Sequence, residues 1–219
     1  MPLVYSVCSN GNCIKYSYFF FKCMDKKILV TSILTPFLFW LTTFIGGMIN
    51  VGYNHLHNTI SELGMTGAPA AGFMLIALIM LSVFSLAFSI LFFISCKTLK
   101  VSAIPAVLSV SMPLSILWAA IFPMGNNLHD KQGPLPLVLL LGMLFALFEW
   151  PKKEFYKDRF WSGIVVLVVL LIFLRFLRPF SNEYDGLTQR FFYLGWTIWC
   201  ISIGVLFSKR LKELKQKKR

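Results

Sequence analysis

The chain has 219 residues, of which 57% are hydrophobic and only 14% are charged, whereas about 25% are charged in an average soluble protein. This composition excludes an ordinary water-soluble domain and indicates a protein that lies in a lipid bilayer. A transmembrane β-barrel is excluded because barrel strands alternate polar and apolar residues, and runs such as 164–173 (IVVLVVLLIF) do not. The predicted fold class is therefore an all-α, polytopic membrane protein, since helices satisfy their own backbone polar groups in lipid.

Six apolar stretches are predicted to cross the bilayer as helices, because a hydrocarbon core of about 30 Å requires about 20 apolar residues. They are expected at residues 28–49, 70–94, 101–122, 135–150, 161–178 and 190–208. Three prolines fall inside these spans and are expected to kink them: Pro36, Pro105 and Pro113.

The spans are predicted to form one domain without a soluble part. We expect a cytoplasmic N-terminal extension at 1–27, a six-helix transmembrane domain at 28–208 and a basic cytoplasmic tail at 209–219. Met24 directly precedes Asp25, Lys26 and Lys27 at the edge of the first span, so it is an alternative start of translation.

Basic residues predict the orientation in the membrane. Of the 21 Lys and Arg residues, 17 lie before the first span, between the second and third, between the fourth and fifth, or in the tail. The others fall on the opposite side: Lys131, Arg175, Arg178 and Arg190. Because cytoplasmic loops carry the excess of Lys and Arg, both termini are predicted to be cytoplasmic, in a multi-pass protein of the cell inner (plasma) membrane. The basic tail is expected to contact anionic membrane lipids, and nucleic acid is not expected as a partner.

Rare polar residues gather on the predicted outer side. All three histidines of the chain lie there, together with several hydroxyl and carboxyl groups: His55, His57, Ser61, Glu62, His129 and Asp130. We interpret His55, His57 and Ser61 as ligand-binding residues, and Glu62, His129 and Asp130 as candidate catalytic residues. Because imidazole and carboxylate groups bind zinc, His55, His57 and His129 are also candidate ligands of a zinc ion. The alternative is that these histidines only hydrogen-bond lipid headgroups and the loop backbone.

Two further groups have both a structural and a functional interpretation. Thr59 and Glu62 fit a capping box, in which Glu62 would reach back to the backbone at the start of a short helix. The alternative makes Glu62 a general acid or base, or a metal ligand. Arg175 and Arg178 lie on one face of the predicted fifth span. They would either extend to the membrane surface, form an ion pair with a carboxylate of the outer side, or bind an anionic headgroup.

The motifs on the outer side resemble a known family. They are the stretch 53–64 (YNHLHNTISELG), the Gly67-Ala68-Pro69 that follows, and Phe122-Pro123 with His129. These residues resemble the prokaryotic membrane family called domain of unknown function 998, and the resemblance covers residues 28–208. It implies six helices and an outer-face site, and it implies no reaction. Many members carry an acid shortly after the Phe-Pro pair, where this chain has Gly125, so Asp130 is the alternative carboxylate there.

Three hypotheses of function follow. The first is a membrane protein with an outer-face polar cavity that binds a lipid or lipid-linked ligand, because rare polar groups converge on one side of an apolar chain. The second is a metal-assisted hydrolase or transferase that acts on lipids at the outer face. The third is a small-solute transporter, which the serines and prolines of the third span favour but the apolar second, fourth and sixth spans do not.

Overall fold

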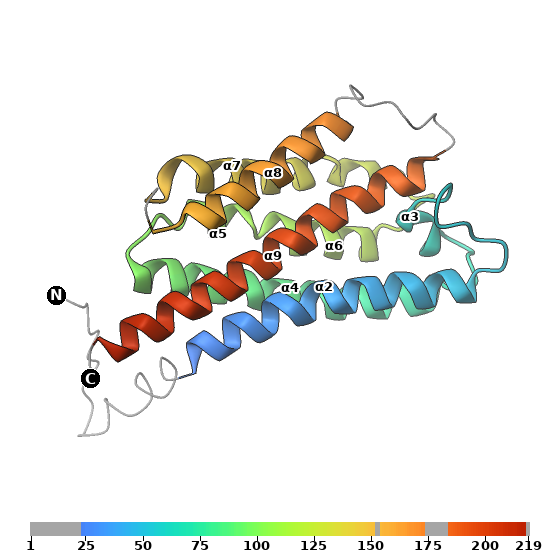
Figure 1. Ribbon diagram of the computed structural model, residues 1–219. Helices are drawn as coiled ribbons and strands as arrows, with labels where there is room; N and C mark the ends of the chain where they lie inside the picture. Colours follow the sequence, from blue (N-terminus) through green and yellow to red (C-terminus); the bar gives the residue numbers. More distant parts are fainter. Residues whose placement is uncertain (1–22, 152–153, 174–183, 218–219) are drawn as a thin grey trace, which may run out of the picture.

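The computed structural model describes residues 23–151, 154–173 and 184–217, apart from the side chains of 158 and 170–173. Within these ranges the chain forms helices joined by loops (Figure 1). The long helices are α2 (Met24–Ile49), α4 (Ala71–Leu99), α7 (Pro134–Glu149), α8 (Tyr156–Phe173) and α9 (Asp185–Gln216). The shorter ones are α3 (Ile60–Leu63), α5 (Ile104–Leu108), α6 (Ser111–Ile121) and the 3-10 helix η1 (His129–Gln132).

Among the described residues, five helical segments are long and apolar enough to cross a membrane: Met24–Ile49, Ala71–Leu99, Ile104–Ile121, His129–Glu149 and Asp185–Gln216. Helix α8 adds a shorter apolar stretch, Arg159–Val169. The predicted all-α class is therefore confirmed for the described residues, and the apolar helices indicate an integral membrane protein. The predicted fifth span, 161–178, runs beyond the described part of α8.

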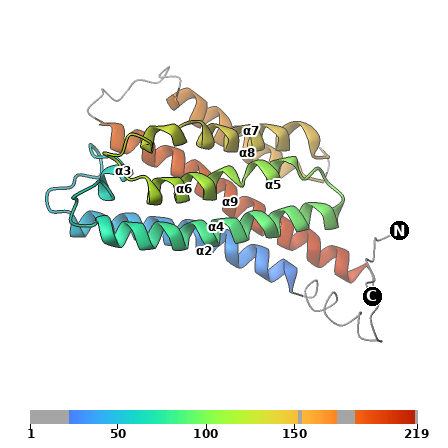
Figure 2. The same cartoon turned by 180° about the vertical axis from the view of Figure 1, so that it is seen from behind.

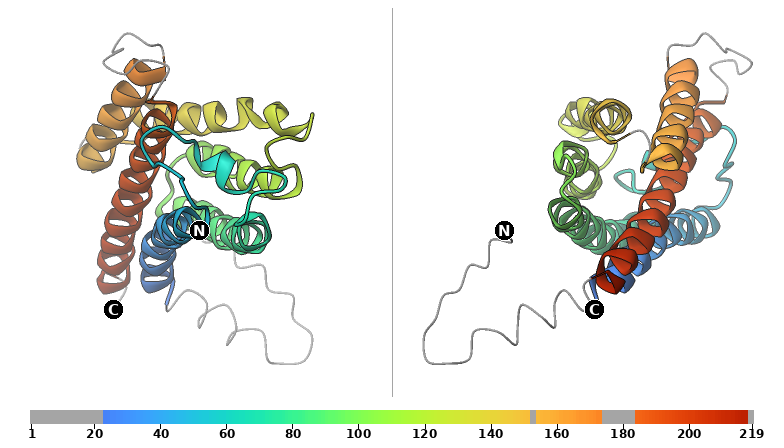
Figure 3. Two further views of the ribbon diagram at one scale, coloured as in Figure 1. Left: turned by 90° about the vertical axis from the view of Figure 1, so that its right-hand side faces the viewer. Right: turned by 60° about the vertical axis from the view of Figure 1, so that its left-hand side comes forward.

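The helices form a bundle whose two ends differ. Helix α2 begins and α9 ends at the same end, where Lys215 and Asp25 form an ion pair (Figure 1). We call the end marked by this pair the basic end, and the opposite end, marked by residues 50–70, the α3 end. Helix α9 packs against α2 and α8, α4 packs against α2 and α6, and α7 packs against α5 and α8. Figures 2 and 3 show α4, α5, α6 and α7 together on one side of the bundle and α8 and α9 on the other.

The third span is interrupted between α5 and α6, just before Pro113, as that proline predicts, whereas Pro105 lies in the first turn of α5. Between α5 and α6 the backbone takes a tighter turn, in which the Val110 N–H donates to Val107 O at 3.1 Å. Pro113 has no N–H with which to continue the helical ladder. The Ser82 hydroxyl of α4 donates to Pro113 O at 2.9 Å, so a neighbouring helix supports the interrupted segment. Helix α2, in contrast, is continuous through Pro36.

Buried aromatic rings join α4, α7 and α9 in the half of the bundle near the basic end. The ring of Phe92 meets those of Trp199 and Phe207 edge-on, with centroids 5.7 and 5.2 Å apart. Trp150, at the end of α7, lies 5.3 Å from Phe207 and is also buried. Each such pair contributes about 0.5–1.5 kcal/mol beyond the area it buries. Helix α9 is therefore the element on which most of the bundle is assembled.

Candidate functional site

The loop between α2 and α4 folds back over the α3 end, and Asn50 anchors it. The Asn50 side chain is buried. Its Nδ2 donates to Leu63 O at 3.3 Å, and its Oδ1 accepts from the Ala70 N–H at 2.8 Å. One amide thus joins the end of α2, the end of α3 and the start of α4. It fixes the position of α3, next to which most of the predicted site residues lie.

Glu62 caps α3, as its spacing from Thr59 predicts. Its Oε1 accepts from the Thr59 N–H at 2.7 Å and from the Thr59 hydroxyl at 2.9 Å, and its Oε2 accepts from Asn58 Nδ2 at 2.6 Å. Burial opposes ionisation of this carboxyl, but these hydrogen bonds and the charge of Arg190 outweigh it and lower the pKa of Glu62. Because the Glu62 carboxylate is ionised and both of its oxygens accept hydrogen bonds, Glu62 is better suited to holding α3 in position than to transferring a proton.

Arg190 of α9 binds the same loop from the other side. Its Nη1 donates to Asn58 O at 2.9 Å and to Gly186 O at 2.8 Å. Its Nη2 donates to Tyr53 Oη at 2.7 Å and lies 2.9 Å from His55 Nδ1. The planar guanidinium can make this set of bonds because it carries five N–H donors in a fixed fork. Arg190 therefore holds α9 and the loop between α2 and α4 in one arrangement.

His55 lies between Arg190 and α2. Because arginine can only donate, His55 Nδ1 must accept, which assigns the neutral imidazole with its proton on Nε2. The ring packs against Gly47, where a Cβ would lie 2.6 Å from Nε2. Burial, and then the charge of Arg190, lower the pKa of His55. Burial raises the pKa of Tyr53, although its hydrogen bond from Arg190 opposes this shift. Arg190 is thus the one charged member of this trio at neutral pH.

The N-terminus of α9 also contacts the loop. The Gly186 N–H donates to His57 O at 3.1 Å, and the Leu187 N–H donates to Leu56 O at 2.9 Å. These carbonyls satisfy donors in the first helical turn, where no intrahelical acceptor exists. The exposed His57 side chain stacks on the Tyr184 ring, with the centroids 4.9 Å apart. The backbone of this loop therefore serves as the cap of α9.

His129 belongs to a separate group, in the connection between α6 and α7. Its side chain is buried, and its Nδ1 lies 2.7 Å from Phe122 O. The neighbouring Asp130 is exposed. The two connections touch through the backbone, where the Thr66 N–H donates to Met124 O at 3.0 Å. The hydrogen bonds of His129 hold the turn after α6, and its side chain does not join the Arg190 group.

A groove of about 560 Å³ lies where these two connections meet. Its walls are small and apolar side chains at the start of α4 and the end of α6, including Leu75, Leu78 and Ile121. The loops contribute Gly64, Gly67, Thr66 and Pro123. No Asp, Glu, Lys or Arg is among the described residues that line it. The groove is therefore an apolar surface whose floor comes from glycine and alanine residues.

The chain matches a known protein family. The profile of the family described as "Protein of unknown function (DUF998)" matches residues 33–206. The chain belongs to the DUF998 family. Searches of curated proteins and of solved structures gave no match. The family profile runs from α2 into α9, so the resemblance carried by the ISELG and Phe-Pro motifs is confirmed.

In this DUF998 protein the predicted site residues fall into two groups. His55 and Glu62 lie in the loop that Arg190 binds, with Ser61 half-buried on α3 and His57 exposed beside it. His129 and Asp130 lie on the other connection. Arg175 and Arg178, the predicted anion-binding pair, are outside the described residues.

The three histidines are not gathered at one point. Within residues 23–151, 154–173 and 184–217, no three His, Cys, Asp or Glu side chains are placed so that they could hold a metal ion. The zinc hypothesis for His55, His57 and His129 therefore gains no support from their placement. Arg190 binds the loop between α2 and α4 although it was not among the predicted site residues. Its signal was present, because it is a rare basic residue on the side that the charge pattern assigns to the outer face.

Proposed function

We propose that this DUF998 protein is a six-pass protein of the inner (plasma) membrane, with both termini in the cytoplasm, that binds a membrane lipid at its α3 end. The position of the helix ends supports the even number of crossings, because α2 begins where α9 ends. Helix α8 would be the remaining crossing. The excess of basic residues on the same side supports a cytoplasmic basic end.

Thiol labelling tests the topology. After replacement of the five native cysteines, single cysteines at Val51 and Asn127, both exposed at the α3 end, should react in intact cells with a reagent that cannot cross the membrane. Cysteines at the exposed Lys100 and Lys157 should react only after lysis. Labelling of Lys157→Cys from outside would reverse the orientation, and labelling of both ends from outside would contradict the six-pass arrangement.

The groove between α4 and α6 carries the proposal of a lipid ligand. Leu75 and Ile121, on its walls, are 44% and 54% exposed on segments apolar enough to cross a membrane. A surface of this kind faces acyl chains. The residues that mark the family, Gly64, Gly67 and Pro123, line the end of the groove next to the loops. One acyl chain would lie along α4 towards Leu78, and the headgroup would lie beside Thr66.

The chemistry of the lining selects a class of lipid. The described lining carries no charged side chain, and its one hydroxyl, that of Thr66, is a neutral hydrogen-bonding group. The ligand is therefore a lipid with an uncharged or zwitterionic headgroup, such as a diacylglycerol or phosphatidylethanolamine. In this proposal Glu62 and Arg190 are positioning residues, because they hold α3 and its loop against the helices that form the groove.

Filling the groove tests the lipid proposal. Gly72 lines it, and a Cβ at this position would meet no atom within 4 Å, so the backbone here accepts a side chain next to the groove. Gly72→Trp is expected to lower the amount of dioleoylphosphatidylethanolamine that the purified protein retains in native mass spectrometry at least about tenfold, the effect of about 1.4 kcal/mol. The thermal midpoint should stay within a few degrees of the wild type.

Gly72→Ala is the matched control, because its single methyl group leaves most of the groove open. It should retain the lipid as the wild type does. Equal retention by Gly72→Trp and the wild type would reject the groove as the lipid site.

A further inference from the structure

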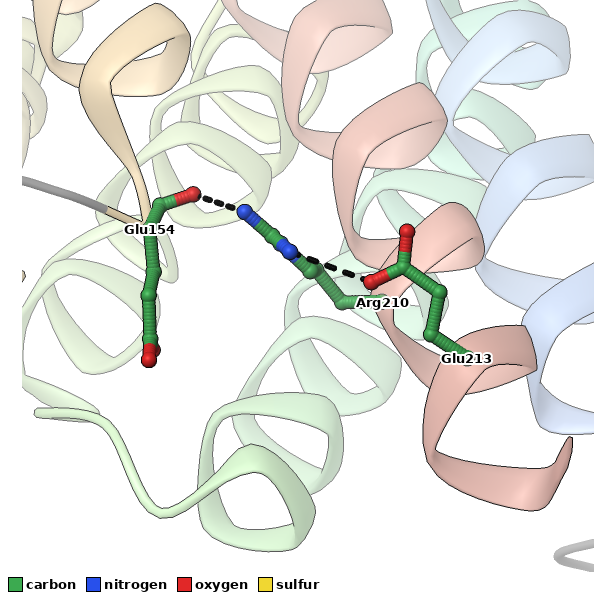
Figure 4. Close-up of polar contacts among 3 residues, drawn as sticks. All are labelled: Glu154, Arg210 and Glu213. Atoms are coloured by element: carbon green, nitrogen blue, oxygen red, sulfur yellow. Dashed lines mark hydrogen bonds and ion pairs between the residues drawn. The ribbon is translucent and has the colours of Figure 1, made fainter. Parts of the chain in front are cut away.

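Two arginines hold the turn between α7 and α8 at the basic end. Arg159 Nη1 donates to Trp150 O at 2.6 Å. Arg210 of α9 donates to Glu154 O and forms an ion pair with Glu213 at 3.0 Å (Figure 4). The Glu154 carboxylate points away from Arg210, so the arginine contacts only the backbone of that residue (Figure 4). Two guanidinium groups are thus concentrated at one turn.

A second groove, of about 440 Å³, starts at this turn and runs along α8. Its lining is apolar except for Arg159 and the hydroxyl of Tyr156, and it comes from Leu147 of α7 and from residues of α8 as far as Leu167. The rings of Tyr156 and Phe160 stack along one wall, with centroids 6.3 Å apart, and both are at least half exposed. Leu147 packs closely against Gly163, where a Cβ would lie 3.3 Å from Leu147 Cδ2, so the absence of a side chain at Gly163 brings α7 and α8 together along the groove.

Arg159 keeps hydrogen-bonding capacity at the end of this groove. Within the described residues, its side-chain hydrogen bond to Trp150 O uses one Nη group of a fork that carries five N–H donors. In the described part of the chain the ion pairs are Arg210–Glu213 and Lys215–Asp25, so no described carboxylate lies within 4 Å of Arg159. Lys157, two residues away, is exposed and adds a second positive charge. A cation at the edge of a membrane favours an anionic partner, and a phosphate oxygen pair matches the guanidinium fork.

We propose that the groove between α7 and α8 binds one anionic phospholipid of the leaflet at the basic end. Its phosphate would bind Arg159, with Lys157 close by. One acyl chain would lie over Gly163 and Ile164 towards Leu167, against the wall made by Phe160. This site is separate from the groove at the α3 end, and it binds an anionic headgroup instead of an uncharged or zwitterionic one. The difference arises because the guanidinium of Arg159 lies at the end of this groove, whereas no charged side chain is among the described residues that line the groove at the α3 end.

Native mass spectrometry with two defined lipids tests this site. Protein in a non-ionic detergent is mixed with equal amounts of dioleoylphosphatidylglycerol and dioleoylphosphatidylcholine. The wild type should retain the anionic lipid severalfold more. Arg159→Gln should reduce that retention about fivefold, since one basic residue near anionic lipid contributes about 1 kcal/mol. Phosphatidylcholine retention should fall less, because its choline cation already neutralises the charge of its phosphate. Phe160→Ala should reduce retention of both lipids, because it removes a wall that contacts the acyl chain and leaves Arg159 in place.

Lys97→Gln is the matched control, because Lys97 is an exposed lysine of α4 that does not line the groove. It should retain phosphatidylglycerol as the wild type does. Equal retention of the two lipids by the wild type would overturn the proposal. The same loss in Lys97→Gln and Arg159→Gln would also overturn it, because the effect would then come from overall charge. Since Gly72 is not part of this groove, the two lipid proposals fail independently.

Discussion

Gly204→Ala is expected to lower the apparent free energy of unfolding by about 3 kcal/mol, the upper part of the usual range for overpacking a tightly packed interior. Helices α2 and α9 approach each other closely at this residue. A Cβ on Gly204 would overlap both the Oγ and the Cβ of Ser32, and it would lie 3.3 Å from Ile28 O. Rotation of the Ser32 hydroxyl relieves only the first overlap, so the helices must separate. Unfolding in a denaturing detergent, followed by tryptophan fluorescence, measures the loss.

A second substitution distinguishes this clash from a general effect of alanine. In the double variant Ser32→Gly, Gly204→Ala the added methyl group takes the space of the removed side chain, so most of the stability should return. The two single effects will then not add, as is typical of residues in contact. Gly72→Ala, which meets no atom within 4 Å, should be neutral or slightly stabilising. Equal losses in Gly204→Ala and Gly72→Ala would contradict the packing of α2 on α9.

Arg190→Ala is expected to release the loop between α2 and α4 from α9. The substitution leaves Asn58 O, Gly186 O and the Tyr53 hydroxyl without their shared donor. Because hydrogen bonds to charged groups contribute about 1.5–3 kcal/mol each and this loop is half-buried, the expected loss is about 3 kcal/mol in all. Limited proteolysis should show faster cleavage within residues 51–59, and the helical circular dichroism signal should remain.

Two variants control for the loss of charge. Arg190→Lys keeps the charge but not the fork, so it should recover only part of the stability. Lys131→Ala removes an exposed basic residue on the other connection at the α3 end, and the protease should cleave this variant at the wild-type rate. If Arg190→Ala is as resistant to cleavage as Lys131→Ala, Arg190 does not hold this loop.

Local signals in the sequence predict the helices well, because they depend only on neighbouring residues. The apolar runs are long enough to locate α2, α4, α7 and α9, and Pro113 locates the interruption of the third span. Thr59 and Glu62 are three residues apart, so their capping box forms within α3 and could be predicted from the sequence. The family motifs are likewise stretches of neighbouring residues, so the resemblance to the DUF998 family could be recognised from the sequence alone.

Only the tertiary structure decided which faces meet. Phe37 and Phe39 of α2 are two residues apart and equally apolar, yet Phe37 is 59% exposed and Phe39 is buried against Tyr193 and Trp196. In a soluble helix the polar face would reveal this choice, but lipid is as apolar as the interior, so hydrophobicity does not distinguish them. The contacts of Arg190 join residues that are far apart in the sequence, and both grooves form between separate helices. The sequence by itself therefore determined the membrane class, the helices and the family, and the packing of α4 beside α6 and of α7 against α8 determined where the two grooves form.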